Sequence, residues 1–531
     1  MPTITLNKKD VLNLIGRKLS DNILKERIPM LGTDLSSVTD KEITVEIFPN
    51  RPDMLSEEGF SRALSSFLGI KKGLRKYKVN PSKYKYKIDS KVKKVRPFAV
   101  ASVIKDIELT DETVNSLMQL QEKLHITHGR NRKKVAMGVH DLDKIKFPLI
   151  YTTKPTSFRF IPLDFNKELS LHEILEIHPK GKEFAHLLKG FKGYPLWLDA
   201  SNNVLSMPPI INSDLTKVTQ ETKNLFLDIT GTDKNAVEQA LNILVCACAD
   251  RKGKIYKVNQ CPNLAPKKIK IDINYINKTL GLNLKSSQIK QLLERMGMTL
   301  QGSAVLYPAY RTDILNQIDI AEDIAIAHGY EKFKEEIPNI STIAEESKFE
   351  VFKQKISNIM IGLNLQEVST FHLTDKETQT SLMLNNSEVI QVENSKSSEY
   401  DTLRSWLIPS LLRVLKNNKH NEYPQRIFEI GNIFNKKGEF TRLCVMISHS
   451  DADYTEVRQI LDSLSSNLNI NLSYRETDFS SFIPGRMARV SYKNKDIAYI
   501  GEIHPKVLSN FSLENPVSCF ELNLTELFNL L

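Results

Sequence analysis

The sequence predicts a multidomain α+β protein in which two small helix-rich modules flank an α/β segment and precede an antiparallel sheet with helices. Three observations support this prediction: a repeat of about 70 residues, alternating strand-like and helical stretches between its two copies, and further strand-like stretches in the C-terminal third. A chain of 531 residues is long enough for several domains. The expected domains cover residues 1–80, 81–262, 265–335 and 348–531.

The composition is typical of a globular protein, with 41% hydrophobic and 26% charged residues. A chain of this size buries enough apolar surface to fold without disulfides or a structural metal. The only C-x-C pair lies in an apolar helical stretch, with no histidine cluster to complete a zinc site. No signal-peptide pattern is present, and the longest apolar run, near residues 241–249, is too short to span a bilayer. We therefore expect a cytoplasmic protein with reduced thiols at Cys246, Cys248, Cys261, Cys444 and Cys519.

The repeat is the most informative pattern in the sequence. Each copy predicts a short strand, a helix that ends at glycine, and a second helix that begins at serine and ends at glycine. A proline-started segment and a third helix follow in both copies, at residues 48–70 and 307–330. Two homologous modules are therefore expected on either side of a long middle segment. The equally spaced positions are Ile4, Leu6, Val11, Gly16, Leu19 and Gly32 in the first copy, and Ile269, Ile271, Ile276, Gly281, Leu284 and Gly297 in the second.

The two copies differ in the acidic residues around the third helix. The first copy keeps Asp53 but has Gly59, Arg62 and Ala63 where the second copy has acids. Three of the second copy's four carboxylates share a helical face by i, i+3, i+4 spacing, and no basic residue stands among the four. Crowded carboxylates favour a hard cation such as Mg²⁺, although acids also favour a helix start through its dipole. The predicted metal ligands are Asp313, Asp319, Glu322 and Asp323.

The net charge of +10 is concentrated in residues 71–96, which hold twelve Lys or Arg residues and one Asp. Interleaved with Tyr77, Tyr84 and Tyr86, these cations suit a polyanion such as RNA, through phosphate contacts and base stacking. The alternative is an edge strand whose lysines are solvated while Tyr84, Tyr86 and Ile88 point inward. The sequence leaves both interpretations open.

Several motifs together resemble the β subunits of phenylalanine–tRNA ligases of the archaeal and eukaryotic type. The paired motifs FPNRPDMLSEEG and YRTDILNQIDIAEDIAIAHGY carry the resemblance, as does LHITHGRNRKKVAMGVHDLDKI at residues 124–145. It extends to TLRSWLIPSLL (402–412), RIFEIGNIF (426–434) and IGEIHPKVL (500–508). The resemblance covers essentially the whole chain in order, without the additional domains of the longer bacterial β subunits.

The resemblance implies a division of labour between two kinds of chain. In such ligases the α subunit uses ATP and phenylalanine to form the adenylate and charges tRNA(Phe). The β subunit binds RNA and carries an editing domain and a catalytic-like domain that has lost its activity. The resemblance also implies an (αβ)₂ heterotetramer acting in protein biosynthesis. It further implies a Mg²⁺ site on the four acidic residues of the second module.

Residues 81–262 are expected to form the editing domain, which would hydrolyse mischarged Tyr-tRNA(Phe). An apolar pocket rejects an added hydroxyl by only about a hundredfold, so a second site that hydrogen-bonds the tyrosine hydroxyl improves selection. Asp228, inside the apolar stretch LFLDIT, is predicted to bind this hydroxyl, and Asn212 to position the ester or a water; a turn-capping Asp is the alternative. Neither a Ser-His-Asp order nor a Cys-His pair presents a nucleophile, so a positioned water is expected. Further substrate-binding candidates are Ser206, Thr222, Thr230, Arg130 and Arg132, of which the two arginines would contact phosphates.

Residues 348–531 suggest an antiparallel sheet with helices on one face, as in the class II synthetase core. An active class II site needs an arginine with a downstream acid, and a glycine-rich helix start that ends in arginine. Arg404 has no acid close behind it, and Pro484-Gly485-Arg486 falls short of the second requirement. We therefore expect that this domain does not activate ATP and that it packs on the α subunit. An unrelated α+β domain is the alternative.

Two other functions stay open from the sequence: a free-standing deacylase of mischarged tRNA, and a non-enzymatic nucleic-acid-binding protein. A lone deacylase would not need a catalytic-like docking domain. Plain nucleic-acid binding would not require buried polar positions in residues 206–230.

Overall fold

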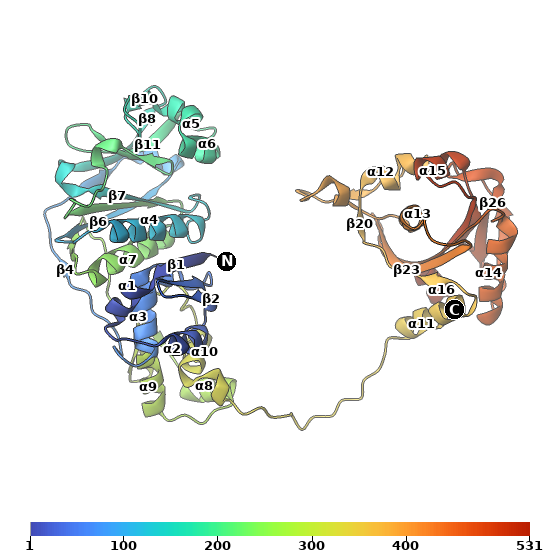
Figure 1. The fold of residues 1–531 in the computed structure, drawn as a ribbon, viewed down its shortest axis with the longest axis horizontal. Coiled ribbons are helices and arrows are strands. Elements are labelled where there is room, and N and C mark those ends of the chain that lie inside the picture. Colours follow the sequence, from blue (N-terminus) through green and yellow to red (C-terminus); the bar gives the residue numbers. More distant parts are fainter. Residues whose placement is uncertain (1) are drawn as a thin grey trace. The chain divides into compact units, whose positions relative to one another are not determined.

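The computed structural model describes residues 2–531 and divides into two compact units, one ending at Ile337 and the other beginning at Pro338 (Figure 1). Each unit is described by itself. Within the described residues, no helix is both long and apolar enough to cross a membrane.

The two copies of the repeat have the same architecture. In each, three strands form a small sheet in which the third strand lies between the other two, in the orders β1-β3-β2 and β16-β18-β17. Gly16 and Gly281 end the first helix of each copy in the left-handed conformation that glycine adopts without strain. The first module comprises β1 (Thr3–Asn7), α1 (Lys8–Ile15), α2 (Asp21–Met30), β2 (Asp34–Val38), β3 (Glu42–Glu46) and α3 (Glu57–Phe67). The second comprises β16 (Lys267–Lys270), α8 (Ile273–Leu280), α9 (Ser286–Arg295), β17 (Thr299–Gln301), β18 (Ala304–Tyr307) and α10 (Gln317–His328).

The two modules pack against each other through equivalent surfaces. A β-carbon on Gly32 would lie 3.7 Å from Ile326 Cδ1, and one on Gly297 would lie 3.8 Å from Ser66 Oγ. Gly32 and Gly297 match in the repeat, and so do Ser66 of α3 and Ile326 of α10. The modules therefore meet with an approximate twofold relation, although the middle segment separates them in the chain.

The middle segment forms two five-stranded sheets, in the orders β4-β15-β6-β14-β7 and β13-β12-β11-β8-β5. Alternation along β14 assigns its side chains to two cores: Leu225, Leu227 and Ile229 pack with the helices, whereas Phe226 packs with Trp197 of the second sheet. Asp228 lies on the same side of β14 as Phe226, so it faces the second sheet. The strands are β4 (Val79–Asn80), β5 (Tyr86–Ile88), β6 (Phe98–Lys105), β7 (Val135–Asp141), β8 (Leu149–Pro155), β11 (Gly193–Leu198), β12 (Val204–Met207), β13 (Ile211–Asn212), β14 (Leu225–Gly231) and β15 (Lys254–Lys257).

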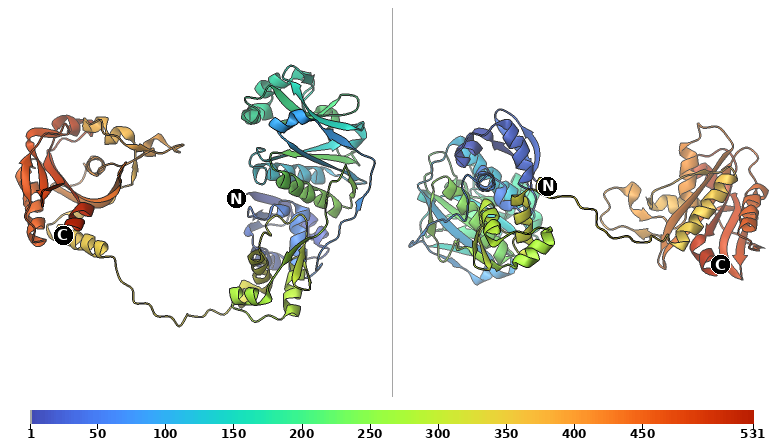
Figure 2. Two further views of the ribbon diagram at one scale, coloured as in Figure 1. Left: turned by 180° about the vertical axis from the view of Figure 1, so that it is seen from behind. Right: turned by 90° about the horizontal axis from the view of Figure 1, so that it is seen from below.

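Helices α4 (Asp111–Ile126) and α7 (Lys234–Asp250) lie between the first of these sheets and the first module, as both side views show (Figures 1 and 2). Their apolar residues share one core with the first module. A smaller layer on the second sheet holds β9 (Arg159–Phe160), β10 (Leu169–Ser170), α5 (Leu171–Ile177) and α6 (Pro179–Phe184).

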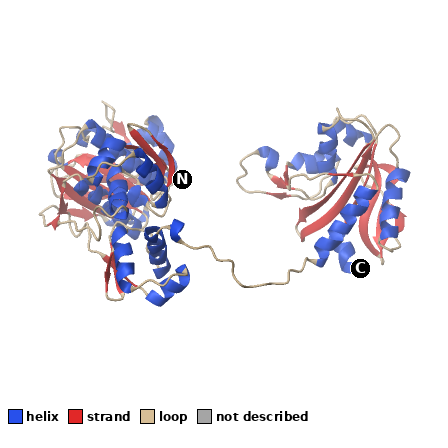
Figure 3. Cartoon of the chain, turned by 60° about the horizontal axis from the view of Figure 1, so that its bottom comes forward, coloured by secondary structure: helices blue, strands red, loops and turns tan. Residues whose placement is uncertain are grey.

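The second unit is built on a seven-stranded sheet in the order β19-β23-β24-β28-β27-β26-β25, in which only β19 and β23 run parallel. Helices cover both faces, so the prediction of helices on one face is wrong (Figure 3). One face packs under α11 (Lys348–Gly362), α14 (Tyr454–Asn467) and α16 (Leu524–Leu530), and the other under α13 (Ile408–Asn417) and α15 (Pro505–Asn510).

The strands of this sheet are β19 (Gln366–Glu367), β23 (Gln425–Asn435), β24 (Gly438–Ser448), β25 (Ser473–Glu476), β26 (Phe482–Tyr492), β27 (Lys495–Ile503) and β28 (Val517–Asn523). A separate small sheet joins β20 (Leu373–Thr374), β22 (Thr402–Leu403) and β21 (Ile390–Gln391), and the short helix α12 (Lys376–Gln379) follows β20.

Candidate functional site

A cavity of about 400 Å³ lies in the middle segment between α4, β7 and the β12–β13 hairpin. It brings together four residues predicted from the sequence, Asp228, Asn212, Ser206 and Arg132. Apolar side chains such as Met118, Val139 and Ile210 form much of its wall. A mostly apolar cavity with a few converging polar groups is the usual form of a small-ligand site.

Asp228 is 1% exposed, and one of its carboxylate oxygens is fully engaged. Its Oδ2 lies 2.7 Å from His140 Nε2 and accepts a hydrogen bond from Ser206 Oγ at 3.2 Å. His140 Nδ1 lies 2.8 Å from Thr216 Oγ1. Within the described residues, the other oxygen, Oδ1, has no hydrogen-bond partner. Asp228 therefore offers one free acceptor in a cavity wall.

Asn212 contributes an amide to the same cavity. Its Nδ2 donates to Val139 O at 3.3 Å, which fixes the side chain across the β7 edge. The amide oxygen has no hydrogen bond to the part of the chain that is described, so it can accept from a ligand or a water.

Helix α4 forms the opposite wall through side chains that bind β7. Gln121 Nε2 donates to Met137 O at 2.7 Å, and His125 Nε2 accepts from Met137 N at 2.8 Å. Burial lowers the pKa of His125, which agrees with a neutral ring that accepts from the backbone. Burial works against ionisation of Glu122, yet His125 and Arg132 together lower its pKa to about 2.

Arg132 has a structural role in this wall. Its guanidinium donates to Ile210 O at 2.8 Å and to Glu122 Oε1 at 2.5 Å, and it lies over the Phe184 ring at 4.5 Å. Three of the other predicted residues lie outside the cavity lining. Thr222 donates to Asp141 and Thr230 accepts from Arg96, whereas Arg130 is exposed on a turn.

Sequence reasoning missed His140, Thr216 and Gly138. Gly138 is the ladder partner of Asp228, and it lies next to the carboxylate. The available signal was a histidine inside the apolar strand VAMGVHD, where every residue is buried. A buried histidine in a strand needs partners, and here one partner is the predicted carboxylate.

The acidic residues of the second module do lie near one another, but the prediction that no basic residue stands among them is wrong. Arg311 donates to Asp313 Oδ2 at 2.6 Å and to Asp323 Oδ2 at 2.7 Å. Asp319 accepts from the backbone of Leu315 and Asn316, ahead of α10.

The charges of this cluster are only partly balanced. Burial raises the pKa of Glu322, and the charges of Asp323, Asp313 and Asp319 raise it further. Even so, in residues 2–531 no group of three or more His, Cys, Asp or Glu side chains has the arrangement of a metal site. With Arg311 bound to two carboxylates and Asp319 bound to backbone, the four predicted ligands do not fit Mg²⁺.

The basic segment, residues 71–96, provides an edge strand to each sheet of the middle segment, β4 to one and β5 to the other. Its tyrosines are already engaged, since Tyr77 donates to Asp250, Tyr86 donates to Ala99 O, and Tyr84 packs on Phe147. These contacts favour the edge-strand interpretation, and base stacking by the tyrosines stays a prediction. Ile88, predicted to point inward, is 43% exposed. Most of the lysines remain exposed.

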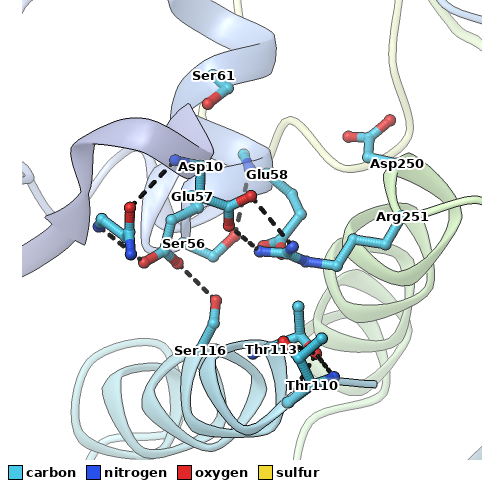
Figure 4. A network of polar contacts seen from close by, with 12 residues as sticks. Asp10, Ser56, Glu57, Glu58, Ser61, Thr110, Thr113, Ser116, Asp250 and Arg251 are labelled. Atoms are coloured by element: carbon cyan, nitrogen blue, oxygen red, sulfur yellow. Dashed lines mark hydrogen bonds and ion pairs between the residues drawn. The ribbon is translucent and has the colours of Figure 1, made fainter. Parts of the chain in front are cut away.

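A polar network joins the first module to the helices beneath the cavity sheet (Figure 4). Arg251, just after α7, pairs with Glu58 and with Asp10 at 2.6 Å. Glu57 accepts from Ser116 Oγ of α4 at 2.5 Å. Burial raises the pKa of Glu58, and the Arg251 charge opposes that rise. The first module thus holds the helix that also forms one cavity wall.

In the second unit, Arg404 is 1% exposed and committed to internal contacts. Its Nη1 donates to Glu429 Oε1 at 2.6 Å, and its Nε donates to Asn432 O at 2.7 Å. The sequence next to Arg404 lacks an acid, and the fold supplies one: Glu429 on β23, whose carboxylate neutralises Arg404. This strand is separated from β24 only by Lys436 and Lys437.

Comparison with known proteins gives one consistent result. The phenylalanyl tRNA synthetase beta chain CLM domain matches residues 334–524, the tRNA synthetase B5 domain matches 269–330, and the B3/4 domain matches 82–245. The chain is 41% identical to the phenylalanine–tRNA ligase beta subunit of Archaeoglobus fulgidus, covering 100% of this chain and 99% of that protein. It is 40% identical to that of Pyrococcus abyssi, covering 99% and 100%. An N-terminal fragment of the Pyrococcus horikoshii beta subunit, known from a crystal structure, is 39% identical with a TM-score of 0.58, covering 62% of this chain and 99% of the fragment.

Proposed function

The chain belongs to the phenylalanine–tRNA ligase β-subunit family, and from this premise we propose that it works with an α chain and hydrolyses Tyr-tRNA(Phe) in its own cavity. The observation that carries the editing proposal is the free carboxylate oxygen of Asp228 in a mostly apolar cavity.

The cavity suits the discrimination of tyrosine from phenylalanine. The tyrosine hydroxyl donates to Asp228 Oδ1 while the ring lies against the apolar wall. Phenylalanine lacks this donor and would leave a buried carboxylate oxygen unpaired, which costs about 1–3 kcal/mol or more. A site built around a hydroxyl discriminates better than a site that only excludes one.

Hydrolysis proceeds by attack of water on the ester carbonyl. The bond between the carbonyl carbon and the ribose oxygen breaks, the leaving ribose oxygen takes a proton that the attacking water gives up, and tyrosine and uncharged tRNA leave. Asn212 positions the ester or the water through its amide oxygen. Ser206 donates to Asp228, and His140 bonds the same carboxylate oxygen and not Ser206, so a serine–histidine pair is not formed here and water is the proposed nucleophile.

We propose that the second unit docks on the α subunit in an (αβ)₂ assembly and does not itself activate ATP. The pairing of Arg404 with Glu429 makes this guanidinium unavailable to a nucleotide, and helices cover both faces of the sheet. ATP, phenylalanine and the adenylate would then be handled by the α chain. The exposed lysines of residues 71–96 would contact tRNA phosphates.

The experiment is aminoacylation of total tRNA with phenylalanine and ATP, first by this chain alone and then with its α subunit. We expect no charging by the chain alone and phenylalanine-specific charging by the pair. Hydrolysis of Tyr-tRNA(Phe) is then measured with the pair. Charging by the chain alone would contradict the non-catalytic second unit. A stable pair that hydrolyses Tyr-tRNA(Phe) but does not charge tRNA would favour a deacylase.

A further inference from the structure

We infer that His140, supported by Thr216, is the positioning residue that makes Asp228 present Oδ1 to the substrate. The inference rests on the proposed editing function and adds a residue that sets its specificity without touching the ligand. It stands on a buried chain of hydrogen bonds from Thr216 through His140 to Asp228.

The role of Nε2 follows from its partner. A carboxylate only accepts, so His140 Nε2 carries the proton that bonds Asp228 Oδ2 at 2.7 Å. Thr216 Oγ1 lies 2.8 Å from Nδ1, where the hydroxyl can donate to the ring or accept from it. In both cases the Nε2 proton is directed at Oδ2, which is the contact that the inference requires.

Both donors to Asp228 converge on one oxygen. His140 Nε2 and Ser206 Oγ bind Oδ2, and nothing in the described residues binds Oδ1. The torsion of an aspartate carboxylate is broad and roughly twofold, so an untied group exchanges its two oxygens freely. Without His140, only the longer Ser206 contact would hold the orientation, and the acceptor would no longer point reliably at the ligand.

The surrounding fold keeps His140 in this position. It is fully buried, and across the β7–β14 ladder it pairs with Phe226, whose ring centroid lies 6.0 Å from its own. A histidine that served only to fill this core would tolerate an apolar replacement of similar size. A positioning histidine would need a replacement that still donates to Asp228.

The test compares His140→Leu with His140→Gln in the αβ complex. The glutamine amide can donate to Asp228, and the leucine cannot. We expect His140→Leu to slow single-turnover hydrolysis of Tyr-tRNA(Phe) by roughly tenfold to a hundredfold, as expected for a misplaced contact group. We expect His140→Gln to recover most of that loss, and we expect both variants to charge phenylalanine normally. Equal losses in both variants, or no loss in either, would overturn the inference.

A second measurement uses the unmutated protein, so it does not depend on a variant folding. With ¹⁵N-labelled histidine, the His140 ring should give the signature of a protonated Nε2, and Thr216→Val should shift its Nδ1 signal. A ring protonated only at Nδ1 would overturn the inference. Asp228→Ala separates the two proposals: if it abolishes hydrolysis while His140→Leu does not affect it, only the positioning role fails. If Asp228→Ala hydrolyses normally, the editing function itself fails.

Discussion

Gly138 on β7 and Asp228 on β14 are ladder partners, and their pairing leaves no room for a side chain at position 138. A β-carbon there would lie 2.4 Å from Asp228 Oδ2 and 2.5 Å from His140 Nε2. The smallest residue is thus required next to the carboxylate, for reasons of space and not of backbone conformation.

Gly138→Ala is therefore expected to displace Asp228 or His140 and to slow Tyr-tRNA(Phe) hydrolysis by about tenfold or more. Phenylalanine charging by the complex should not change. Gly362→Ala is the matched control, because a β-carbon at Gly362 meets nothing within 4 Å. Normal hydrolysis by Gly138→Ala would mean that the carboxylate does not contact the substrate.

Asp228→Ala is expected to reduce Tyr-tRNA(Phe) hydrolysis at least about a hundredfold, because it removes the acceptor for the tyrosine hydroxyl. Misacylated product should then accumulate when the complex is given tyrosine, while charging with phenylalanine stays near the unmodified rate. Asp143→Ala, at an exposed aspartate that bonds Asn224 outside the cavity lining, is the control. Unchanged Tyr-tRNA hydrolysis in Asp228→Ala would refute the assignment.

Removal of divalent metal is expected to leave the first unit as stable as before. Arg311 already compensates Asp313 and Asp323, so EDTA should not shift the unfolding transition reported by Trp197 in a Trp406→Phe background. A transition that drops with EDTA and returns with Mg²⁺ would restore the metal-site prediction.

Arg311→Met is expected to lower the free energy of unfolding of the first unit by about 3–5 kcal/mol, because it leaves the buried carboxylates of Asp313 and Asp323 without their cation. The same Trp197 fluorescence reports it, and Lys290→Met at an exposed lysine of α9 is the control. A loss no larger than in the control would mean that water or an ion compensates these acids.

Ionisation of Glu122 should make the stability of the first unit depend on pH in the acidic range. Burial opposes its ionisation, but His125 and Arg132 bring its folded-state pKa from the ordinary 4.5 to about 2. A carboxyl with a lowered pKa contributes stability above about pH 4.5 and loses it as the pH falls toward 2. Unfolding of Glu122→Gln should therefore differ most from the unmodified protein above about pH 4.5 and converge with it only as the pH reaches about 2. Glu112→Gln, exposed on the same helix, should show no such convergence.

The sequence was most informative where a local rule applies. Gly16 and Gly281 mark helix ends at matching positions, so the repeat predicted the first strand and the helices of both modules, although it missed the other two strands of each. Asp228 stood out because a carboxylate inside an apolar strand needs a reason to be buried. These inferences depend on residues close together in the chain.

The remaining features depend on residues that are far apart in sequence. His140 is paired with a carboxylate 88 positions later, and Arg404 with one 25 positions later. Thr230 shares β14 with Asp228 and points to the same side, yet it binds Arg96 and not the cavity. Arg311 stood beside the predicted metal ligands in the sequence, but only the fold shows that its side chain turns toward two of them.

The contact between Gly32 and Ile326 joins positions nearly 300 residues apart. At about 5–20 residues per second, a ribosome needs roughly 15–60 s to deliver the second module after the first has emerged. Throughout that interval the nascent first module exposes the surface that the second module later covers. Translation speed through the middle segment, and any chaperone that shields this surface, should therefore influence the yield of correctly assembled chain.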